Sequence, residues 1–342
     1  MRAAIYNPYL DTLGGGERYT LVFANVLQKI GYEVYIQWNN DSILERIEQR
    51  FGLNTNGIKI VKNIKRGDGY DFCFWISDGS IPLLRARKNI LHFQIPFMHV
   101  SGRSLINKMK LFRINAVICN SNFTKNIIDS EYGIDSIVIY PPVDIDKIKP
   151  KKKRNIILSV GRFSQLTQAK RQDVLVEVFK ILLKRGLTGW KLILAGGTEV
   201  GADKNFFKLK KAVAGYPIEI IENPKYKDLI KLYSSAKLFW SASGYDINEN
   251  TDPQKVEHFG ITIVEAMSAG AVPLVFNAGG HKEIVKEGLN GYLWSSKSDL
   301  LKKTINLINK RNDLIEISQN AVIKSNDFGY ERFYEEVSKI IR

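Results

Sequence analysis

Short apolar runs alternate with segments of helical period along almost the whole chain, and no other feature of the sequence constrains the fold as strongly. Apolar runs of about four to eight residues are typical of buried strands, and a helix between two such strands lets them run parallel. The predicted strands cover residues 2–7, 33–38, 58–61, 71–76, 89–93, 116–120, 137–140, 156–161, 190–195, 219–221, 236–241 and 272–276. The predicted helices cover residues 17–30, 173–185, 226–235, 262–269, 300–310, 313–325 and 330–341. We therefore expect an α/β protein in which helices cover parallel sheets.

The alternation breaks once, near the middle of the chain. Pro141 and Pro142 end the first set of strands, and residues 147–154 are charged, contain a proline and lack an apolar period. A chain of 342 residues is also long enough for two domains. We predict one domain over residues 1–147, a second over residues 148–326 and a separate C-terminal helix over residues 327–342.

The basic residues gather in two zones. Lys and Arg together number 50 and Asp and Glu 35, a net charge of +15. Residues 51–113 carry 11 basic and 3 acidic side chains, and residues 147–171 carry nine basic and no acidic ones. Such zones fit an anionic membrane surface or phosphate-bearing substrates, while a nucleic-acid partner is the alternative that the net charge raises.

Neither a targeting segment nor a metal-binding pattern stands out. The N-terminus is too soon interrupted for a secretory signal, and no stretch approaches about 18 apolar residues, so we expect a soluble, cytoplasmic protein. Cys73 and Cys119 stand alone in strand-like runs, which predicts neither a disulfide scaffold nor a zinc site. No His, Asp and Glu cluster has metal-ligand spacing, and we expect no metal cofactor.

The segment 257–273, EHFGITIVEAMSAGAVP, carries the most chemical information. Gly260 permits a tight turn at the start of a helix, whose free N–H groups and positive dipole end would face a phosphate. Glu265, one turn into that helix, can grip a ribose diol. Glu257, before the turn, can reach sugar hydroxyls. The alternative is a solvated cap and a helix-dipole partner.

This segment resembles the donor site of the retaining glycosyltransferases of family 4. Their GT-B fold has two Rossmann-like, doubly wound domains that face a central cleft, and their donor site carries a Glu-x7-Glu motif. The resemblance implies that Glu257 holds hydroxyls of the donor sugar and that Glu265 binds the ribose. It also implies that backbone N–H groups of three residues meet the sugar and diphosphate, namely Phe259, Gly260 and Ile261.

A second cluster lies between a predicted strand end and the next helix. Cations there would stabilise a nucleoside diphosphate as its bond to the sugar breaks. The resemblance assigns this role to Arg162 after the strand and to Lys170 before the helix. Arg171 is an alternative to Lys170, because the intervening segment is longer than in some family members. A basic surface rim would explain the same residues without a ligand.

Two further features lie in the first domain. Three glycines, among them Gly15 and Gly16, join the first strand to the first helix and would let a donor phosphate or an acceptor approach the backbone closely; a plain turn is the alternative. His92 ends a predicted strand, where the resemblance implies a catalytic position near the anomeric carbon. A buried core histidine is the competing interpretation, and His99 and His281 have weaker claims.

Together these features predict a retaining hexosyltransferase. It would move a hexose from a nucleoside diphosphate sugar to a hydroxyl of a glycan or lipid-linked acceptor, with GDP-mannose slightly favoured over UDP-hexoses. The resemblance implies that residues 327–342 cross back to the first domain. Residues 102–113 mix basic and apolar side chains, so a helix there would suit peripheral contact with an anionic membrane, or simply cover the core. The alternatives are a GT-B sugar-nucleotide epimerase and a basic nucleic-acid-binding protein.

Overall fold

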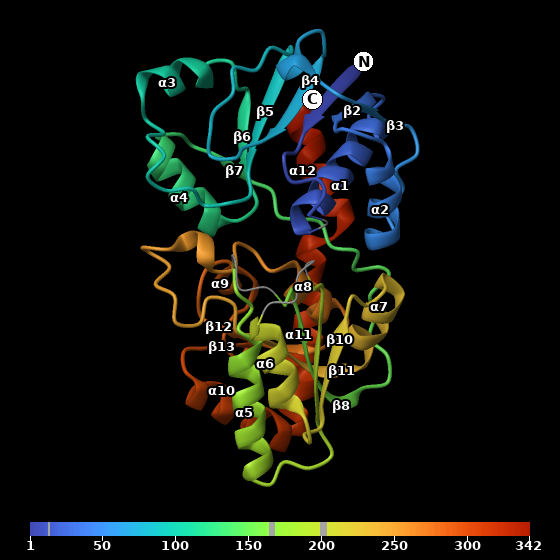
Figure 1. Ribbon diagram of the computed structural model, residues 1–342, viewed down its shortest axis with the longest axis vertical. Coiled ribbons are helices and arrows are strands. Elements are labelled where there is room, and N and C mark those ends of the chain that lie inside the picture. The colour runs from blue at the N-terminus through green and yellow to red at the C-terminus, as the bar shows by residue number, and fades with distance from the viewer. Residues whose placement is uncertain (13, 164–167, 199–203) are drawn as a thin grey trace. The chain divides into compact units, whose positions relative to one another are not determined.

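The computed structural model describes residues 1–12, 14–163, 168–198 and 204–342, and they form two compact units (Figure 1). Unit 1 comprises Met1–Pro142 and Tyr330–Arg342, and unit 2 comprises Val143–Gly329. The last helix of the chain, α12 (Tyr330–Ile341), therefore packs with the N-terminal residues.

Unit 1 is built on a seven-stranded sheet in which every neighbouring pair is parallel. Its strands are β1 (Arg2–Tyr6), β2 (Glu33–Gln37), β3 (Ile58–Val61), β4 (Phe72–Ile76), β5 (Lys88–Phe93), β6 (Ala116–Cys119) and β7 (Ile137–Val138). They follow the order β3-β2-β1-β4-β5-β6-β7. The strand order therefore reverses direction between β1 and β4.

Helices cover both faces of this sheet. One core joins the sheet to α1 (Gly15–Lys29), α2 (Ser42–Phe51) and α12, and includes Phe23, Phe74 and Val337. A second core, on the opposite face of β5 and β6, joins Phe93 to Ile128 of α4 (Asn122–Tyr132). The short helices of this unit are α3 (Leu105–Leu111) and the 3-10 turn η1 (Lys65–Gly67).

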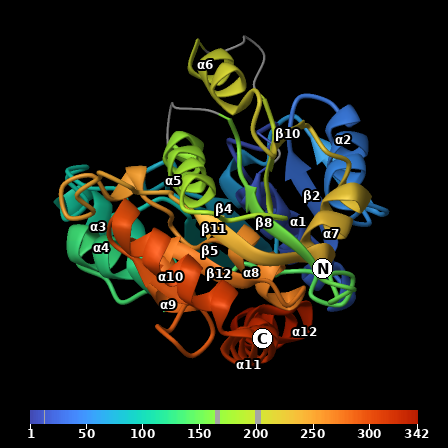
Figure 2. The same cartoon turned by 90° about the horizontal axis from the view of Figure 1, so that it is seen from below.

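Unit 2 repeats the plan with six parallel strands. They are β8 (Arg154–Val160), β9 (Lys191–Gly196), β10 (Ile218–Glu222), β11 (Ala236–Ser241), β12 (Val272–Phe276) and β13 (Tyr292–Trp294), in the order β10-β9-β8-β11-β12-β13. Its helices are α5 (Gln172–Lys184), α6 (Lys204–Val213), α7 (Tyr226–Ser235), α8 (Ile261–Ser268), α9 (His281–Ile284), α10 (Lys297–Asn309) and α11 (Arg311–Ser325), with the 3-10 turns η2 (Pro253–Lys255) and η3 (Asn326–Phe328). Helices α5, α6 and α10 pack in one layer, and α8 packs between β12 and α11 (Figures 1 and 2).

The unit boundaries differ by a few residues from the predicted 1–147, 148–326 and 327–342. The first falls after Pro142 because Val143 pairs with Gly329, and the Val143 N–H donates to the Phe328 carbonyl at 2.8 Å. The second therefore falls after Gly329. The predicted α/β class with two doubly wound, Rossmann-like units is confirmed.

Candidate functional site

The strand order of unit 2 reverses between β8 and β11. In open parallel sheets the loops that leave the two strands on either side of such a reversal diverge, and ligands bind at their carboxyl ends. The loop after β8 leads to Arg162 and Lys170, and the loop after β11 leads to Glu257. Three of the predicted site residues therefore follow the two strands at this switch point.

Lys170 and Glu257 form an ion pair there. The Lys170 Nζ donates to the Glu257 Oε2 at 2.6 Å, and the side chains are 19% and 15% exposed, respectively. Gly161 makes the pair possible, because a Cβ at this residue would lie 2.7 Å from the Cγ of Lys170. The sequence thus places a cation and a carboxylate, 87 residues apart, in direct contact at the sheet edge.

The charge state of this pair follows from its surroundings. Burial alone would raise the pKa of the Glu257 carboxyl, but the Lys170 ammonium outweighs burial and holds that pKa at about 2. His281 lies nearby, wholly buried, and burial lowers its pKa despite the pull of Glu257. Its Nδ1 donates to the Phe276 carbonyl at 2.6 Å, while Lys170 is the cation in direct contact with Glu257.

Helix α8 begins beside Glu257. Gly260 caps it with φ at 119°, a backbone conformation that residues with a Cβ atom rarely adopt. Phe259 is buried and Ile261 half-buried, so any contact of these two residues with a ligand falls mainly to their backbone. Glu265 is only 4% exposed and offers little surface for the ribose contact that the sequence predicts.

Gly279 and Gly280, which the sequence analysis missed, contact the backbone of Glu257 and fix its position. The Gly280 N–H donates to the Glu257 carbonyl at 2.7 Å, and a Cβ on Gly279 would overlap the same oxygen. The Glu249 carboxylate accepts from the Gly279 N–H at 2.6 Å and pairs with Lys282. The sequence signal was present, since two adjacent glycines follow the end of a strand and precede a helix.

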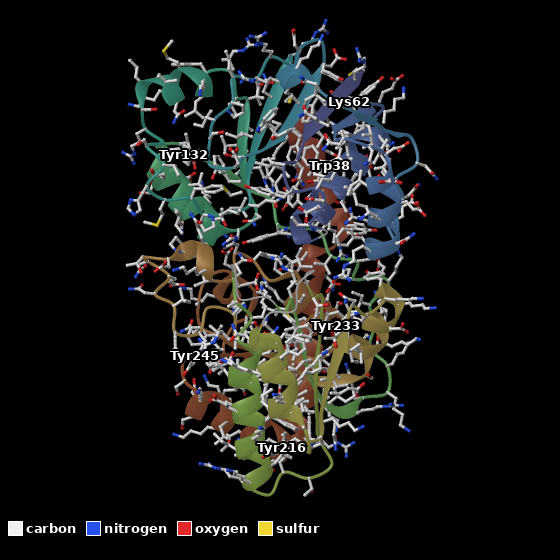
Figure 3. All side chains as sticks on the ribbon, viewed as in Figure 1. Trp38, Lys62, Tyr132, Tyr216, Tyr233 and Tyr245 are labelled. Atoms are coloured by element: carbon white, nitrogen blue, oxygen red, sulfur yellow. The ribbon has the colours of Figure 1, made fainter. Side chains whose placement is uncertain are left out.

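The cluster contains two other basic residues, Arg162 and Arg171. Arg162 is exposed directly after β8, and its carbonyl accepts from Gln172 Nε2 at 3.0 Å. Arg171 bonds Asp173 and lies over the ring of Tyr245, 5.2 Å from its centroid; Figure 3 labels Tyr245. Of the two alternatives at the start of α5, Lys170 is thus the one that contacts Glu257.

The predicted residues of unit 1 lie at the carboxyl ends of β1 and β5. Gly15 and Gly16 begin α1, and a Cβ on Gly16 would overlap the side-chain amide of Gln94. His92 lies in β5 with no exposed surface, stacked on Tyr19 at 4.2 Å. The ring is wholly buried in this structure, which favours the competing interpretation of a core histidine, and the predicted contact with the reacting sugar stays a prediction.

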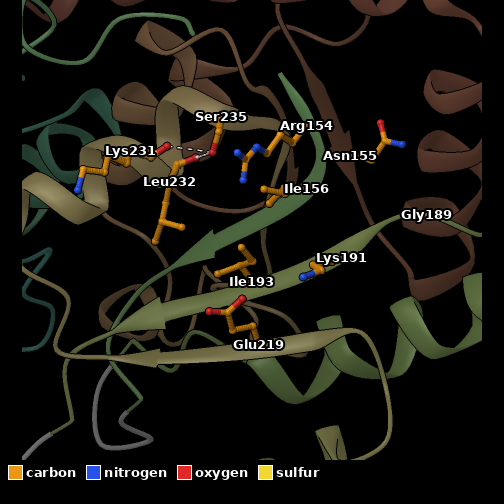
Figure 4. A pocket seen from close by; sticks show the side chains of 10 residues that line it. All are labelled: Arg154, Asn155, Ile156, Gly189, Lys191, Ile193, Glu219, Lys231, Leu232 and Ser235. Atoms are coloured by element: carbon orange, nitrogen blue, oxygen red, sulfur yellow. Dashed lines mark hydrogen bonds between the residues drawn. The ribbon is translucent and has the colours of Figure 1, made fainter. Parts of the chain in front are cut away.

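The cavity shown in Figure 4 lies elsewhere in unit 2. It encloses about 420 Å³ at the amino ends of β8, β9 and β10, beside the end of α7. Its lining residues are Arg154, Asn155, Ile156, Gly189, Lys191, Ile193, Glu219, Lys231, Leu232 and Ser235. None of the predicted site residues is among them, since those of unit 2 follow the carboxyl ends of β8 and β11. In the described ranges we find no group of three or more potential metal ligands.

Two doubly wound units, one with a cation–carboxylate pair at its switch point, define the class of GT-B glycosyltransferases. The chain belongs to the family of group 1 glycosyl transferases, whose model matches residues 142–324, more than half of the chain. The expectation that the chain is a member of the glycosyltransferases is confirmed at this level. The comparisons give no support to an epimerase or a nucleic-acid-binding protein.

The chain is similar to several known proteins. It is 26% identical over 246 residues to the GDP-Man:Man(3)GlcNAc(2)-PP-Dol alpha-1,2-mannosyltransferase of Dictyostelium discoideum, matching 68% of this chain and 47% of that protein, so it spans about half the length of that relative. It is 23% identical to an alpha-1,3/1,6-mannosyltransferase of Kluyveromyces lactis, over 94% of this chain and 81% of that one.

A solved structure supports the fold. The HepE protein from Anabaena, in complex with UDP and glucose, superposes with a TM-score of 0.78 over 100% of this chain and 99% of that one, at 18% identity. The predicted GT-B architecture is therefore confirmed. Of the helices within the described residues, none combines the length and the apolar character that crossing a membrane requires.

Proposed function

We propose that the protein is a retaining family 4 glycosyltransferase that moves mannose from GDP-mannose to a hydroxyl of a glycan or lipid-linked acceptor. The observation that carries this proposal is the Lys170–Glu257 pair at the switch point of unit 2. The names of the mannosyltransferase relatives support the choice of donor.

The site residues divide the work by charge. The Glu257 carboxylate accepts hydrogen bonds from donor hydroxyls, while Lys170 keeps it ionised inside a mostly buried site. Arg162, exposed after β8, meets the diphosphate with its planar guanidinium and stabilises the charge that develops as the sugar leaves. The N-terminus of α8 adds backbone N–H groups and the positive end of its dipole.

We further propose that transfer requires no metal cofactor. Arg162 and Lys170 supply the positive charge that a divalent ion supplies in metal-dependent phosphate sites. A chelator should leave the initial rate unchanged, whereas a metal-dependent enzyme would lose its activity and regain it with added Mg²⁺.

A thermal-shift comparison tests the donor assignment. GDP and GDP-mannose should raise the melting temperature more than UDP, ADP, dTDP or their hexose conjugates, since a ligand at 100 times its Kd stabilises by about 2.7 kcal/mol. Arg162→Ala should weaken the GDP shift, and Arg154→Ala, at the other end of β8, should not. A larger shift with UDP would reject GDP-mannose, and no shift with any nucleotide would reject the donor site.

Helix α3 supports the proposal that the protein works at the cytoplasmic face of a membrane. No large apolar side chain on it is buried: Leu105, Ile106, Met109 and Phe112 are 75%, 66%, 63% and 89% exposed. Residues 79–128, which include α3, hold eight basic and no acidic side chains. Exposed apolar groups on a helix that also carries Lys108 and Lys110 fit insertion into an anionic lipid surface.

The loop before α3 is fixed to unit 1. Arg103 donates twice to the Ser130 carbonyl, at 2.7 and 3.0 Å, and the Glu131 carboxylate accepts from the backbone of Val100 at 3.0 Å. Liposome sedimentation tests the contact: charge reversal at Lys108 and Lys110 should abolish binding to anionic vesicles, while charge reversal at Lys180 and Lys184 of α5 should not. Unchanged binding in the α3 variant would reject the membrane proposal.

A further inference from the structure

Glu257 lies between two helical elements, outside any helix or strand. Residues 256–260 join the 3-10 turn η2 to α8 and belong to neither. The backbone carbonyl of Glu257 accepts instead from the N–H of Gly280, at 2.7 Å, in the turn that precedes α9. The position of the Glu257 carboxylate therefore depends on the position of this turn.

Two glycines let the turn approach the backbone around Glu257 closely. A Cβ on Gly279, whose φ is 56°, would lie 2.2 Å from the Glu257 carbonyl oxygen. A Cβ on Gly280 would lie 2.5 Å from both the His258 carbonyl oxygen and the Cα of Phe259. Atoms in contact normally lie about 3.5 to 4.0 Å apart, so the two segments pack with no space between them. A displacement of the turn would therefore move the backbone of residues 257–259.

The carboxylate of Glu249 holds this turn on both sides of Gly280. Its Oε2 accepts from the Gly279 N–H at 2.6 Å, and its Oε1 accepts from the Lys282 ammonium. The Glu249 side chain is 25% exposed, so water has limited access to these bonds. Glu249 thus contacts the residues on either side of the N–H group that holds Glu257.

We propose that Glu249 is a positioning residue of the donor site: its bond to Gly279 sets the place of Glu257 and thereby the binding of the donor sugar. The inference rests on the proposed function, in which Glu257 accepts from donor hydroxyls. Hydrogen bonds weaken steeply as their alignment is lost, and a misplacement of about 1 Å can cost about 100-fold in rate. Glu249 acts through the backbone of Glu257 and touches no donor atom.

Substitutions at Glu249 separate its role as an acceptor from its charge. Glu249→Gln keeps an acceptor oxygen at the same side-chain length, and it should raise the Kd of the sugar nucleotide by less than about threefold. Glu249→Met keeps the length without a strong acceptor, and Glu249→Asp keeps the charge but draws it back by one methylene group. Each of these two should raise that Kd by about tenfold or more.

Calorimetric titration of the full chain measures these constants without an acceptor. The probes are GDP-mannose with GDP, and UDP-glucose with UDP. Because the free nucleotides carry no sugar, their Kd should stay within about twofold of the wild-type value in every variant. A role in overall stability alone would not separate the sugar nucleotide from its free nucleotide in this way.

Two matched controls test neighbouring charges. Lys282→Met removes the ion pair but leaves the bond to Gly279, and Asp252→Asn alters a carboxylate of the same loop that pairs with Lys255 at 2.6 Å. Both should keep the Kd of the sugar nucleotide within about threefold. In the Glu257→Gln background, Glu249→Met should add little further loss, because the two changes act on one contact.

The outcomes separate this inference from the proposed function. A wild type that binds neither sugar nucleotide would reject the donor site and the inference with it. If the wild type binds one of them, equal constants for Glu249→Gln and Glu249→Met would overturn the inference alone, as would a full further loss in the Glu257→Gln background. If Glu249→Met fails to fold, Glu249→Asp decides; loss of free-nucleotide binding in both variants would show a role in folding and overturn the inference.

Discussion

The two units share one topology but place opposite chemistry at their switch points. In unit 2 the strands β8 and β11 lead to a buried ion pair, an exposed arginine and a helix N-terminus, all suited to a sugar nucleotide. In unit 1 the strands β1 and β4 end in the stacked aromatic rings of Tyr6 and Trp75. The shared topology thus provides a switch point in each unit, and the residues that follow the strands give the two switch points different chemistry.

The largest effect is expected from removing the charge of Glu257. Two charge-assisted hydrogen bonds to donor hydroxyls, at about 2 kcal/mol each, predict that Glu257→Gln lowers kcat/KM by about 1000-fold. Steady-state kinetics with GDP-mannose measures it. Glu219→Gln, at the amino end of the same sheet, should leave the rate unchanged. A loss below tenfold for Glu257→Gln would remove this residue from the donor site.

A second prediction tests whether Arg162 stabilises the charge of the diphosphate. Loss of a guanidinium from the developing diphosphate charge should cost about 2 to 3 kcal/mol, which is about 30- to 160-fold in kcat/KM for Arg162→Ala. Arg154→Ala tests the opposite end of β8 and should have no effect. If Arg162→Ala retains more than a third of the wild-type kcat/KM, the guanidinium does not meet the diphosphate.

The backbone of the unit 2 switch point is expected to tolerate no added methyl group. A Cβ on Gly196 would overlap the Gly161 carbonyl, whereas one on Gly197 meets only the Asn223 side chain at 3.7 Å. Gly196→Ala should lower the free energy of unfolding by about 1 to 3 kcal/mol, and Gly197→Ala should change it little. Urea denaturation compares the two neighbours, and equal stabilities would contradict the tight packing.

The sequence predicted the sheets better than the helices. The buried parallel strands are apolar runs with turn residues at both ends, so the expected range coincides with the observed one for β3, β11 and β12. Helices α2 and α4 escaped the analysis because few of their apolar residues are buried. Only Ile43 and Ile47 are buried on α2, which leaves a weak apolar period.

The site was predictable where chemistry leaves a local pattern. Glu257 and Lys170 stand beside strand ends and a glycine turn, and the structure brings them together. How deeply Glu265 and His92 are buried depends on elements distant in sequence that pack over them, so no local sequence pattern reveals their burial. Glu249 and the Gly279–Gly280 turn act through backbone contacts that only the folded chain creates.

Acid should weaken the ion pair in a defined window. The pKa of Glu257 is lowered from 4.5 to about 2 because Lys170 outweighs burial, so the pair stabilises the fold above pH 4.5 and this contribution fades as pH falls toward 2. The stability difference between wild type and Lys170→Met should therefore be largest near neutral pH and shrink below 4.5. Lys180→Met, whose parent residue lies over the Tyr216 ring at 4.2 Å from its centroid, should show no such convergence.

The smallest catalytic effect is expected at His92. Burial lowers its pKa to about 3, and its Nδ1 donates to the Ile118 carbonyl at 3.1 Å, so we expect a neutral ring with a structural role. His92→Gln should change kcat by less than about threefold.

Burial of His92 should also make the stability of the fold depend on pH. Unfolded His binds a proton near pH 6.5 and buried His92 does not, so the free energy of unfolding of the wild type should fall as pH drops below 6.5. His92→Gln should make this dependence on pH weaker. The exposed His99 gives the matched variant, His99→Gln, which should keep the wild-type slope. A kcat loss of 100-fold with normal folding would return His92 to the catalytic machinery and give unit 1 a role in the chemical step.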